Sequence, residues 1–370
     1  MLTKMEIHGF KSIRKLDELQ LRNLNILIGP NGAGKSNLIA FFRMLNWMTG
    51  SFGNLQTFIG KSGGADALLH DGSAKTQHIK ASLSFETTAG INEYDFSLSH
   101  AAKDTLIFVD EKYRFSRHEY PSKREWSSLD SGHKEARIIE RIDKTAEVIL
   151  GLMKNCVVHQ FHNTSETARI RNRWNVEDNV FLKEDGGNLA PFLYRLRENE
   201  QPCYRRIVET IRLIIPFFDD FVLIPDYGSI LLQWREINSD LIFSPSLASD
   251  GTLRIMALIS LLLQPYKLIP NKTIPTVIIL DEPELGLHPA AINVIAGLLK
   301  SVSVNHQVIV ATQSVTFVDQ FDPEDIIVVD RIGRESTFKR LDAQQLNEWL
   351  EEYSIGELWE KNVIGGRPAL

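Results

Sequence analysis

Cysteine is scarce in this sequence, and long apolar runs are missing. Among the 370 residues only Cys156 and Cys203 are cysteines, and they are too far apart for a closely spaced metal-binding or redox pair. We therefore expect a reducing environment and a cytoplasmic protein. The longest apolar run near a predicted helix, residues 255–263, is much shorter than the about 20 residues that span a bilayer. Residues 1–10 are charged and strand-like, so we expect no signal peptide and no membrane partner.

An excess of positive charge is also missing. The formal net charge of -6 argues against a protein that coats nucleic acid through bulk charge. A local surplus of Lys and Arg occurs within residues 111–175, where Arg169, Arg171 and Arg173 alternate beside Trp174. Such a stretch could follow a phosphate backbone while the ring stacks on a base. A solvated charged loop is the simpler interpretation.

The composition that is present is globular. Apolar residues make up 43% of the chain and charged residues 24%, enough to bury a sizeable core in two domains or in one large domain with an insertion. Hydrophobic periodicity predicts the individual elements. The predicted strands are 4–8, 24–28, 79–85, 93–98, 276–280 and 307–311, and the predicted helices are 35–48, 134–150, 189–215, 253–263 and 290–301.

A glycine-rich turn between strand 24–28 and helix 35–48 has the full pattern of a phosphate-binding P-loop. Its glycines let backbone N–H groups point at phosphates, and the positive end of the helix faces the same charge. Lys35 would supply a mobile cation to the β and γ phosphates, and the Ser36 hydroxyl would bind Mg²⁺. The predicted nucleotide contacts are Gly29, Pro30, Asn31, Gly32, Ala33, Gly34, Lys35, Ser36 and Asn37.

Two adjacent carboxylates follow the predicted strand 276–280, at the edge where α/β sheets bind ligands. Asp281 can hold Mg²⁺ through water, and Glu282 can polarise the water that attacks the γ phosphate. An isolated Asp-Glu pair would more simply cap the next turn. The preceding apolar strand and the P-loop favour the catalytic interpretation.

A third segment precedes the helix 253–263. Ser249 suits an N-cap there, and Gly251 permits a close backbone approach. Alone, this segment would be an ordinary helix cap. It gains significance from its position between the P-loop and the acidic pair.

This order of motifs resembles the ABC-type ATPases of the SMC and RecF class. The resemblance implies bound ATP and Mg²⁺ and an ATP-dependent homodimer with a composite site. One copy would contribute Lys35, Ser36, Asp281 and Glu282, and the other would contribute Ser249 and Gly251. Asp250 stands where the commonest signature has glycine, so its carboxylate must turn away from the phosphate.

The fold class we predict is α/β, a P-loop NTPase of ABC type. We expect a mixed, mostly parallel sheet, an inserted α+β lobe and no long coiled coil. The predicted domains are residues 1–75 with the P-loop, residues 76–245 as the inserted lobe, and residues 246–370 with the signature, the acidic pair and the switch strand.

A narrower resemblance rests on residues 249–254, 281–289 and 356–368. These segments are similar to a bacterial family of stand-alone predicted RecF-like ATPases, related to the ATPase parts of phage-defence systems and of overcoming-lysogenization-defect nucleases. The resemblance covers nearly the whole chain. Nuclease relatives carry a Toprim-type domain after the ATPase, for which the stretch after Gln313 is too short, so any nuclease or toxin is expected to be a separate chain.

Two positions depart from the family pattern. Many relatives place a γ-phosphate-sensing histidine after the strand 307–311, where this chain has Gln313. Glutamine donates a hydrogen bond but carries no proton near neutral pH, so slow hydrolysis is expected. The resemblance assigns the Q-loop role, with contacts to Mg²⁺ and nucleotide, to Gln160, with His162 as an alternative. His159 and His162 lack further ligands for zinc and are interpreted as structural.

The function we predict is an ATP-driven dimeric switch that binds DNA, or senses a DNA state, in DNA repair or antiphage defence. The alternative is an ATP-dependent scaffold that holds a separate effector, a nuclease or toxin, and never touches DNA. A transporter subunit is disfavoured by the charged helical insert and by residues 284–289. A small-molecule P-loop kinase would leave Ser249 and Glu282 without roles.

Overall fold

The computed structural model describes residues 1–50, 54–118, 125–265 and 277–367. It divides into two compact units. Unit 1 comprises the described residues of Met1–Val158, Ile274–Ile279 and Asn305–Leu370, and unit 2 those of His159–Thr273 and Leu280–Val304. Of the sequence segments singled out above, residues 119–124, 276 and 368 lie outside the described part.

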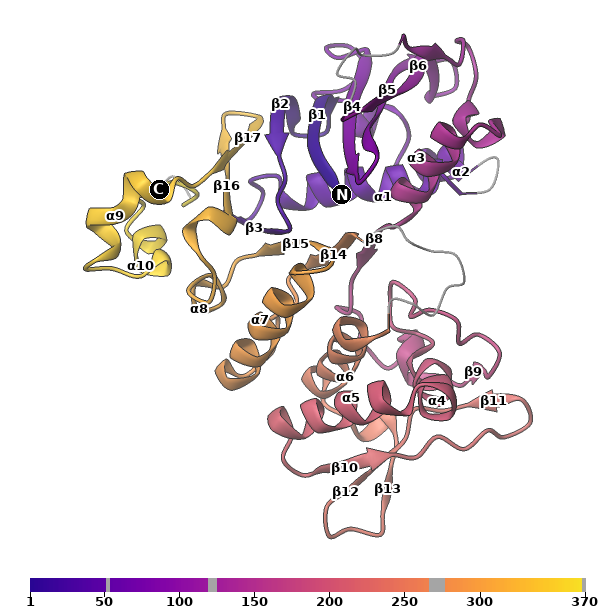
Figure 1. Ribbon diagram of the computed structural model, residues 1–370, viewed down its shortest axis with the longest axis vertical. Helices are drawn as coiled ribbons and strands as arrows, with labels where there is room; N and C mark the ends of the chain where they lie inside the picture. Colours follow the sequence, from indigo (N-terminus) through magenta and orange to yellow (C-terminus); the bar gives the residue numbers. More distant parts are fainter. Residues whose placement is uncertain (51–53, 119–124, 266–276, 368–370) are drawn as a thin grey trace. The chain divides into compact units, whose positions relative to one another are not determined.

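Unit 1 begins with a six-stranded antiparallel sheet, in which Figure 1 shows the first strands side by side. Inward and outward residues alternate along β4, as expected for a sheet with one face on the core. The predicted strands 4–8, 79–85 and 93–98 are confirmed. The sheet order is β2 (Ile13–Gln20), β1 (Leu2–Phe10), β4 (His78–Thr87), β5 (Gly90–Ala101), β6 (Thr105–Arg117) and β7 (Ser127–Ser128).

The pairing of β4 with β1 explains why the described residues of 78–158 belong to unit 1. Strand β4 lies next to β1, with Met5 opposite Leu83, and both side chains are buried in one core. The units therefore divide after Val158, whereas the sequence-based boundary of the inserted lobe is at residue 76. The physical reason is that the apolar face of β4 completes the sheet that β1 begins.

The second six-stranded sheet of unit 1 is mixed. Strand β3 is parallel to β15 on one side and to β16 on the other, while β16 and β17 form an antiparallel hairpin. Every residue of β3 and β15 is buried, as in strands covered on both faces. The order is β17 (Glu335–Arg340), β16 (Ile326–Ile332), β3 (Leu24–Ile28), β15 (Gln307–Thr312), β14 (Val277–Asp281) and β8 (Cys156–His159), the last two continuing into unit 2.

Helix α1 packs its apolar face into the core of unit 1, where the rings of Phe10 and Phe41 meet at 5.5 Å. Its bounds confirm the predicted helix 35–48. The predicted helix 134–150 is wrong at its start, because the Asp143 carboxylate accepts from the N–H groups of Thr145 and Ala146 and caps the helix there. The helices of unit 1 are α1 (Lys35–Met48), α2 (Asn54–Lys61), α3 (Lys144–Lys154), α8 (Val315–Val318), α9 (Ala343–Leu350) and α10 (Ile355–Glu360).

Unit 2 is mainly helical. The single predicted helix 189–215 is two helices, because the chain bends at Glu200 and Pro202 lies in the first turn of the second. Its helices are α4 (Leu189–Asn199), α5 (Gln201–Ile214), α6 (Asp250–Leu263) and α7 (Pro289–Ser303), and its strands are β9 (Trp174–Asn175), β10 (Phe218–Phe221), β11 (Ser229–Ile230), β12 (Trp234–Glu236) and β13 (Ile242–Phe243).

Helix length limits what the described residues can form. The longest helix among them, α7, has 15 residues, so the expectation of no long coiled coil is confirmed for this part of the chain. None of the described helices combines the length and the apolar character needed to cross a bilayer.

A candidate nucleotide-binding site

The P-loop joins β3 to α1 in unit 1, as the sequence predicts. The Lys35 side chain is buried and folds back over the loop, where its Nζ donates to the carbonyl oxygens of Gly29 at 2.5 Å and Pro30 at 3.1 Å. Gly34 is the N-cap of α1, and no side chain caps this helix end. The positive end of the helix dipole therefore faces the loop without a competing side-chain acceptor at the cap.

Two P-loop glycines are required by close packing. Gly29 has φ +152° and Gly34 has φ +122°. A Cβ at Gly29 would lie 2.1 Å from the carbonyl oxygen of Val329, and one at Gly34 would lie 2.0 Å from Ser336 Oγ. The hairpin β16–β17 thus lies directly against the outside of the loop, and no larger residue fits at either position.

Side chains of this hairpin hold the carbonyl groups of the loop from outside. Arg331 Nη1 donates to the oxygen of Gly32 at 3.0 Å, and Ser336 Oγ donates to that of Ala33 at 2.5 Å. In a trans peptide the N–H points away from the C=O, so the N–H groups of Ala33 and Gly34 are turned toward the inside of the loop. The Ala33 N–H donates across the loop to Pro30 at 3.2 Å, in agreement with this orientation.

A hydroxyl network extends this support to Asn37. Ser12 Oγ and Ser336 Oγ are 2.6 Å apart, and Asn37 Nδ2 donates to Ser12 Oγ at 2.5 Å. The contact that the structure gives to Asn37 is therefore with the supporting network. Sequence reasoning missed Ser12, Arg331 and Ser336, because no local motif links residues about 300 positions apart.

Gln313 follows directly after β15. In the parallel pairing of β15 with β3, Thr312 lies opposite Ile28, so Gln313 and Gly29 leave the sheet at the same edge. The next residue, Ser314, caps α8 by accepting from the N–H of Phe317 at 3.2 Å. The segment 313–318, which we call the switch segment, thus follows directly from β15 and ends in the capped helix α8.

In unit 2 both Q-loop candidates contact Asp281. Gln160 Nε2 donates to Asp281 Oδ2 at 2.6 Å, whereas His162 Nε2 lies 2.7 Å from the main-chain oxygen of Asp281. Of these two candidates, Gln160 is the one that reaches the carboxylate. The next residue, Glu282, adopts the left-handed conformation with φ +44°, which is uncommon for a non-glycine residue and occurs often at functional sites.

The signature segment of unit 2 is exposed at the start of α6. Ser249 Oγ accepts from the N–H of Thr252 at 3.1 Å and is the N-cap. A Cβ at Gly251 would lie 3.0 Å from the oxygen of Gly286, so a larger side chain would crowd the segment after Asp281. The Asp250 carboxylate accepts from Arg171 Nη2 at 2.9 Å, a partner within its own unit.

Arg254 joins three of the predicted segments within unit 2. Its guanidinium donates to the carbonyl oxygens of Phe161 at 3.2 Å, His162 at 2.9 Å and Leu285 at 2.9 Å. It therefore ties the signature helix to the Q-loop segment and to the turn after Glu282. In the sequence, the role of Arg254 was indicated only by its position five residues after Ser249.

Arg169, Arg171 and Arg173, the alternating arginines before Trp174, are each paired with a carboxylate. Arg169 lies 3.2 Å from Asp185, and Arg173 lies 3.2 Å from Asp226. Arg171 is nearly buried and also donates to the carbonyl oxygens of Pro245 and Ala248, just before the signature. These partners favour a structural role for the three arginines over contact with a phosphate backbone.

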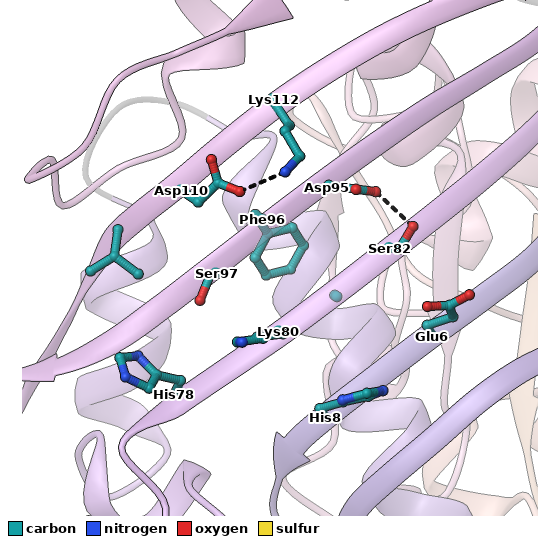
Figure 2. Close-up of a pocket in the computed structure, with 12 residues that line it drawn as sticks. Glu6, His8, His78, Lys80, Ser82, Asp95, Phe96, Ser97, Asp110 and Lys112 are labelled. Carbon is teal, nitrogen blue, oxygen red and sulfur yellow. Dashed lines mark hydrogen bonds and ion pairs between the residues drawn. The ribbon is translucent and has the colours of Figure 1, made fainter. Parts of the chain in front are cut away.

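Two of the hollows in the described part of unit 1 are lined by charged side chains. One, of 480 Å³, lies on the polar face of the antiparallel sheet, where Figure 2 shows charges of both signs and the contact of Ser82 with Asp95 at 2.6 Å. None of the predicted site residues lines it. The other, of 380 Å³, is lined by Ser12, Asn37 and Arg331 and so adjoins the P-loop support. Lys11 also lines it, and burial lowers the pKa of its ammonium group.

Comparison with known proteins identifies the family. Residues 24–319 match the model of a family described as "AAA domain, putative AbiEii toxin, Type IV TA system". This match spans the P-loop, the signature, the acidic pair and Gln313. The chain belongs to this AAA family.

Solved structures show which fold this AAA-family member has. A crystal structure of an SMC head bound to the C-winged helix domain of ScpA is 18% identical, with a TM-score of 0.59 over 94% of this chain and 99% of that one. The SMC head domain of Pyrococcus furiosus, with an extended coiled coil and bound to the C-terminal domain of ScpA, is 16% identical, with a TM-score of 0.56 over 95% and 98%. No curated protein matches the chain.

These comparisons confirm the predicted fold class and the resemblance to SMC- and RecF-like ABC-type ATPases. The AAA-family chain carries a P-loop in a mixed α/β architecture and has the fold of SMC heads. At 16–18% identity the solved structures show the fold alone.

Proposed function

We propose that the protein binds Mg-ATP between two copies of itself and hydrolyses it slowly, so that nucleotide state controls dimerisation. The observation that carries this proposal is the 2.6 Å contact of Gln160 with the Asp281 carboxylate. It brings together the amide and the carboxylate that a Q-loop and a magnesium-binding aspartate would provide.

The residues fit magnesium. Gln160 donates its N–H to Asp281, which leaves its amide oxygen as a donor atom for a cation. The Asp281 carboxylate and the Ser36 hydroxyl of the P-loop motif are likewise hard oxygen donors of the kind that Mg²⁺ prefers. When bound, Mg²⁺ would neutralise phosphate charge and orient the β and γ phosphates.

The remaining residues have separate roles in hydrolysis. Lys35 Nζ now donates to carbonyl oxygens of the loop and would donate to phosphate oxygens instead when ATP binds. The inward N–H groups of the P-loop would bind the β phosphate. Glu282 would accept a proton from water as it attacks the γ phosphorus, and the bond to the bridging oxygen of ADP would break. Gln313 would donate a hydrogen bond to the γ phosphate but could not shuttle a proton.

The second copy would complete the site through its signature segment. Ser249 is exposed at the N-terminus of α6, where a helix end can meet an anion. Because Arg171 holds the Asp250 carboxylate, that negative charge has a partner away from an incoming γ phosphate. The leading proposal for the biological role is a DNA-associated switch in DNA repair or antiphage defence.

An effector-holding scaffold is the second candidate. Two observations favour it: Arg169, Arg171 and Arg173 are each paired with a carboxylate, and the SMC heads that share this fold were solved with ScpA bound. In this case the ATP-dependent dimer would present a surface to a separately encoded nuclease or toxin and would ignore DNA.

The test is mass-resolved sizing of Glu282→Gln protein with and without Mg-ATP, and then with short duplex DNA. We expect ATP to convert the 42.0 kDa chain into a dimer, and Lys35→Ala, as the control, to stay monomeric. Salt-sensitive DNA binding by the dimer would support the switch, and a dimer that ignores DNA would support the scaffold. If ATP changes the mass of neither protein, the nucleotide-sandwiched dimer is wrong.

A further inference from the structure

Residues 354–366, near the end of the sequence, pack against the switch segment at Gly356. Helix α10 begins with a capping box between Ser354 and Glu357. The Gly356 N–H donates to Asp319 Oδ1 at 2.6 Å, and a Cβ at Gly356 would lie 2.5 Å from Val315 Cγ1. Only glycine therefore allows α10 to sit this close to α8, the helix that follows Gln313.

The same segment comes close to the first P-loop residue at Gly366, the last of its glycines. Gly365 and Gly366 form a turn with φ +80° and +75°. A Cβ at Gly366 would lie 2.8 Å from Val328 Cγ1 and 3.6 Å from the Cα of Gly29, the first P-loop residue. The Gly366 N–H donates to Asp330 at 3.2 Å, so the turn is attached to the strand that supports the loop.

Trp359 fixes the distance between these two contacts. Its ring is buried, and its Nε1 donates to the carbonyl oxygen of Gly366 at 2.7 Å. The helix that lies on the switch segment is thereby bonded to the turn that lies on the P-loop. Figure 1 shows α8, α10 and β16 at the same side of unit 1.

We propose that residues 354–366 are a positioning element that couples the P-loop to the switch segment, so that binding of the phosphates at one is transmitted to Gln313 at the other. The proposal rests on the nucleotide site proposed above. It also gives a physical reason for the Gly-Glu-Leu-Trp and Gly-Gly pattern of the tail, which the site itself leaves unexplained: Gly356 and Gly366 each permit one of the close approaches.

The test compares Gly366→Ala with Gly365→Ala. Both residues have left-handed backbones, so both variants carry similar backbone strain. A Cβ at Gly365 meets its nearest atom at an ordinary 3.6 Å, whereas one at Gly366 collides with Val328. We expect Gly366→Ala to weaken ATP binding about tenfold, equivalent to about 1.4 kcal/mol, with Gly365→Ala close to wild type.

The outcomes separate this inference from the proposed function. If the wild-type chain does not bind ATP, the proposed nucleotide site fails. If the wild type binds and both variants bind with the same affinity, only the coupling is wrong. Should Gly366→Ala fail to fold, Trp359→Phe replaces it, since it keeps an aromatic ring but removes the bond to Gly366.

A second comparison tests the contact with the switch segment. Gly356→Ala is expected to lower ATP turnover while leaving ATP affinity within twofold of wild type, because it disturbs α8 and not the P-loop. Gly60→Ala is the matched control, since Gly60 lies in helix α2, where an added Cβ would meet no atom within 4 Å. Equal turnover in the two variants would contradict the coupling.

Discussion

At the scale of single residues, Gln160 and His162 show which part of a site assignment the sequence supports and which part requires the structure. The sequence placed both near the proposed metal site through family resemblance, and both contact Asp281. What the sequence could not distinguish is which atom each one reaches, because this depends on the path of the chain after β8. The geometry favours Gln160 for the Q-loop role, and the assignment stays a prediction.

Gln160→Ala should lower ATP turnover about 10- to 100-fold, the usual range for the loss of a group that orients a metal ligand. His162→Ala, which leaves the Asp281 carboxylate and its amide partner in place, should be affected much less. Phosphate release measured across a Mg²⁺ titration checks this. A larger loss in His162→Ala would reverse the assignment.

His159 gives a pH dependence to stability. Burial lowers the pKa of its imidazole to about 4, below the ordinary value of about 6.5. The unfolded chain therefore binds a proton in this pH window that the folded chain does not. The contribution of neutral His159 to the free energy of unfolding is fully present above about pH 6.5. It is lost as the pH falls toward 4, at up to about 1.4 kcal/mol per pH unit.

His159→Gln should flatten that slope. Urea unfolding at pH 7.5, 6 and 5 would measure it, with wild type as the reference. Burial also lowers the pKa of His306, so part of the slope should remain in the variant. An unchanged slope would mean that the pKa of His159 is the same in the folded and the unfolded chain.

At the scale of elements, the P-loop shows what local pattern does and does not determine. Strand β3 and helix α1 have the predicted bounds, because an apolar run and a glycine-rich turn are local signals. The β16–β17 hairpin that orients the loop was not predicted, since pairing across the sheet depends on the tertiary fold. The break between α4 and α5 was also missed, although Pro202 marks it.

Ser336→Ala should weaken ATP binding several-fold by removing the hydroxyl that holds Ala33 and contacts Ser12. The lost hydrogen bonds should also cost about 1 kcal/mol of stability. Thr337→Ala is the matched control, because Thr337 is the exposed neighbour on the same strand. Calorimetric titration with ATP measures the difference, and equal affinities would show that the hairpin does not orient the loop.

At the scale of the whole molecule, the predicted site is divided between two copies. The sequence indicated this arrangement only by resemblance, because one chain carries all the motifs without showing which of them act together. Lys35 belongs to unit 1 and Ser249 to unit 2, and each lies in a segment held by contacts of its own unit. A test of the composite site must therefore combine two different variants in one dimer.

Lys35→Ala and Ser249→Arg should each be inactive alone, because every dimer then has two damaged sites. In a mixed dimer, one site combines an intact Lys35 with an intact Ser249 from the other copy. Mixing the two inactive proteins should therefore restore a measurable part of the wild-type ATP turnover. No recovery, while mixed dimers are detected by mass, would mean that Ser249 does not act across the interface.

The place of β3 in its sheet has a consequence for synthesis of the protein. This strand leads into the P-loop, yet its neighbours β15 and β16 are made some 280 residues later, and Gly366 later still. A ribosome-bound chain has thus translated its phosphate-binding sequence long before the strands that flank it emerge. A prematurely terminated product would lack β15 and β16, so the strand that leads into its P-loop would have no partner on either side in this sheet.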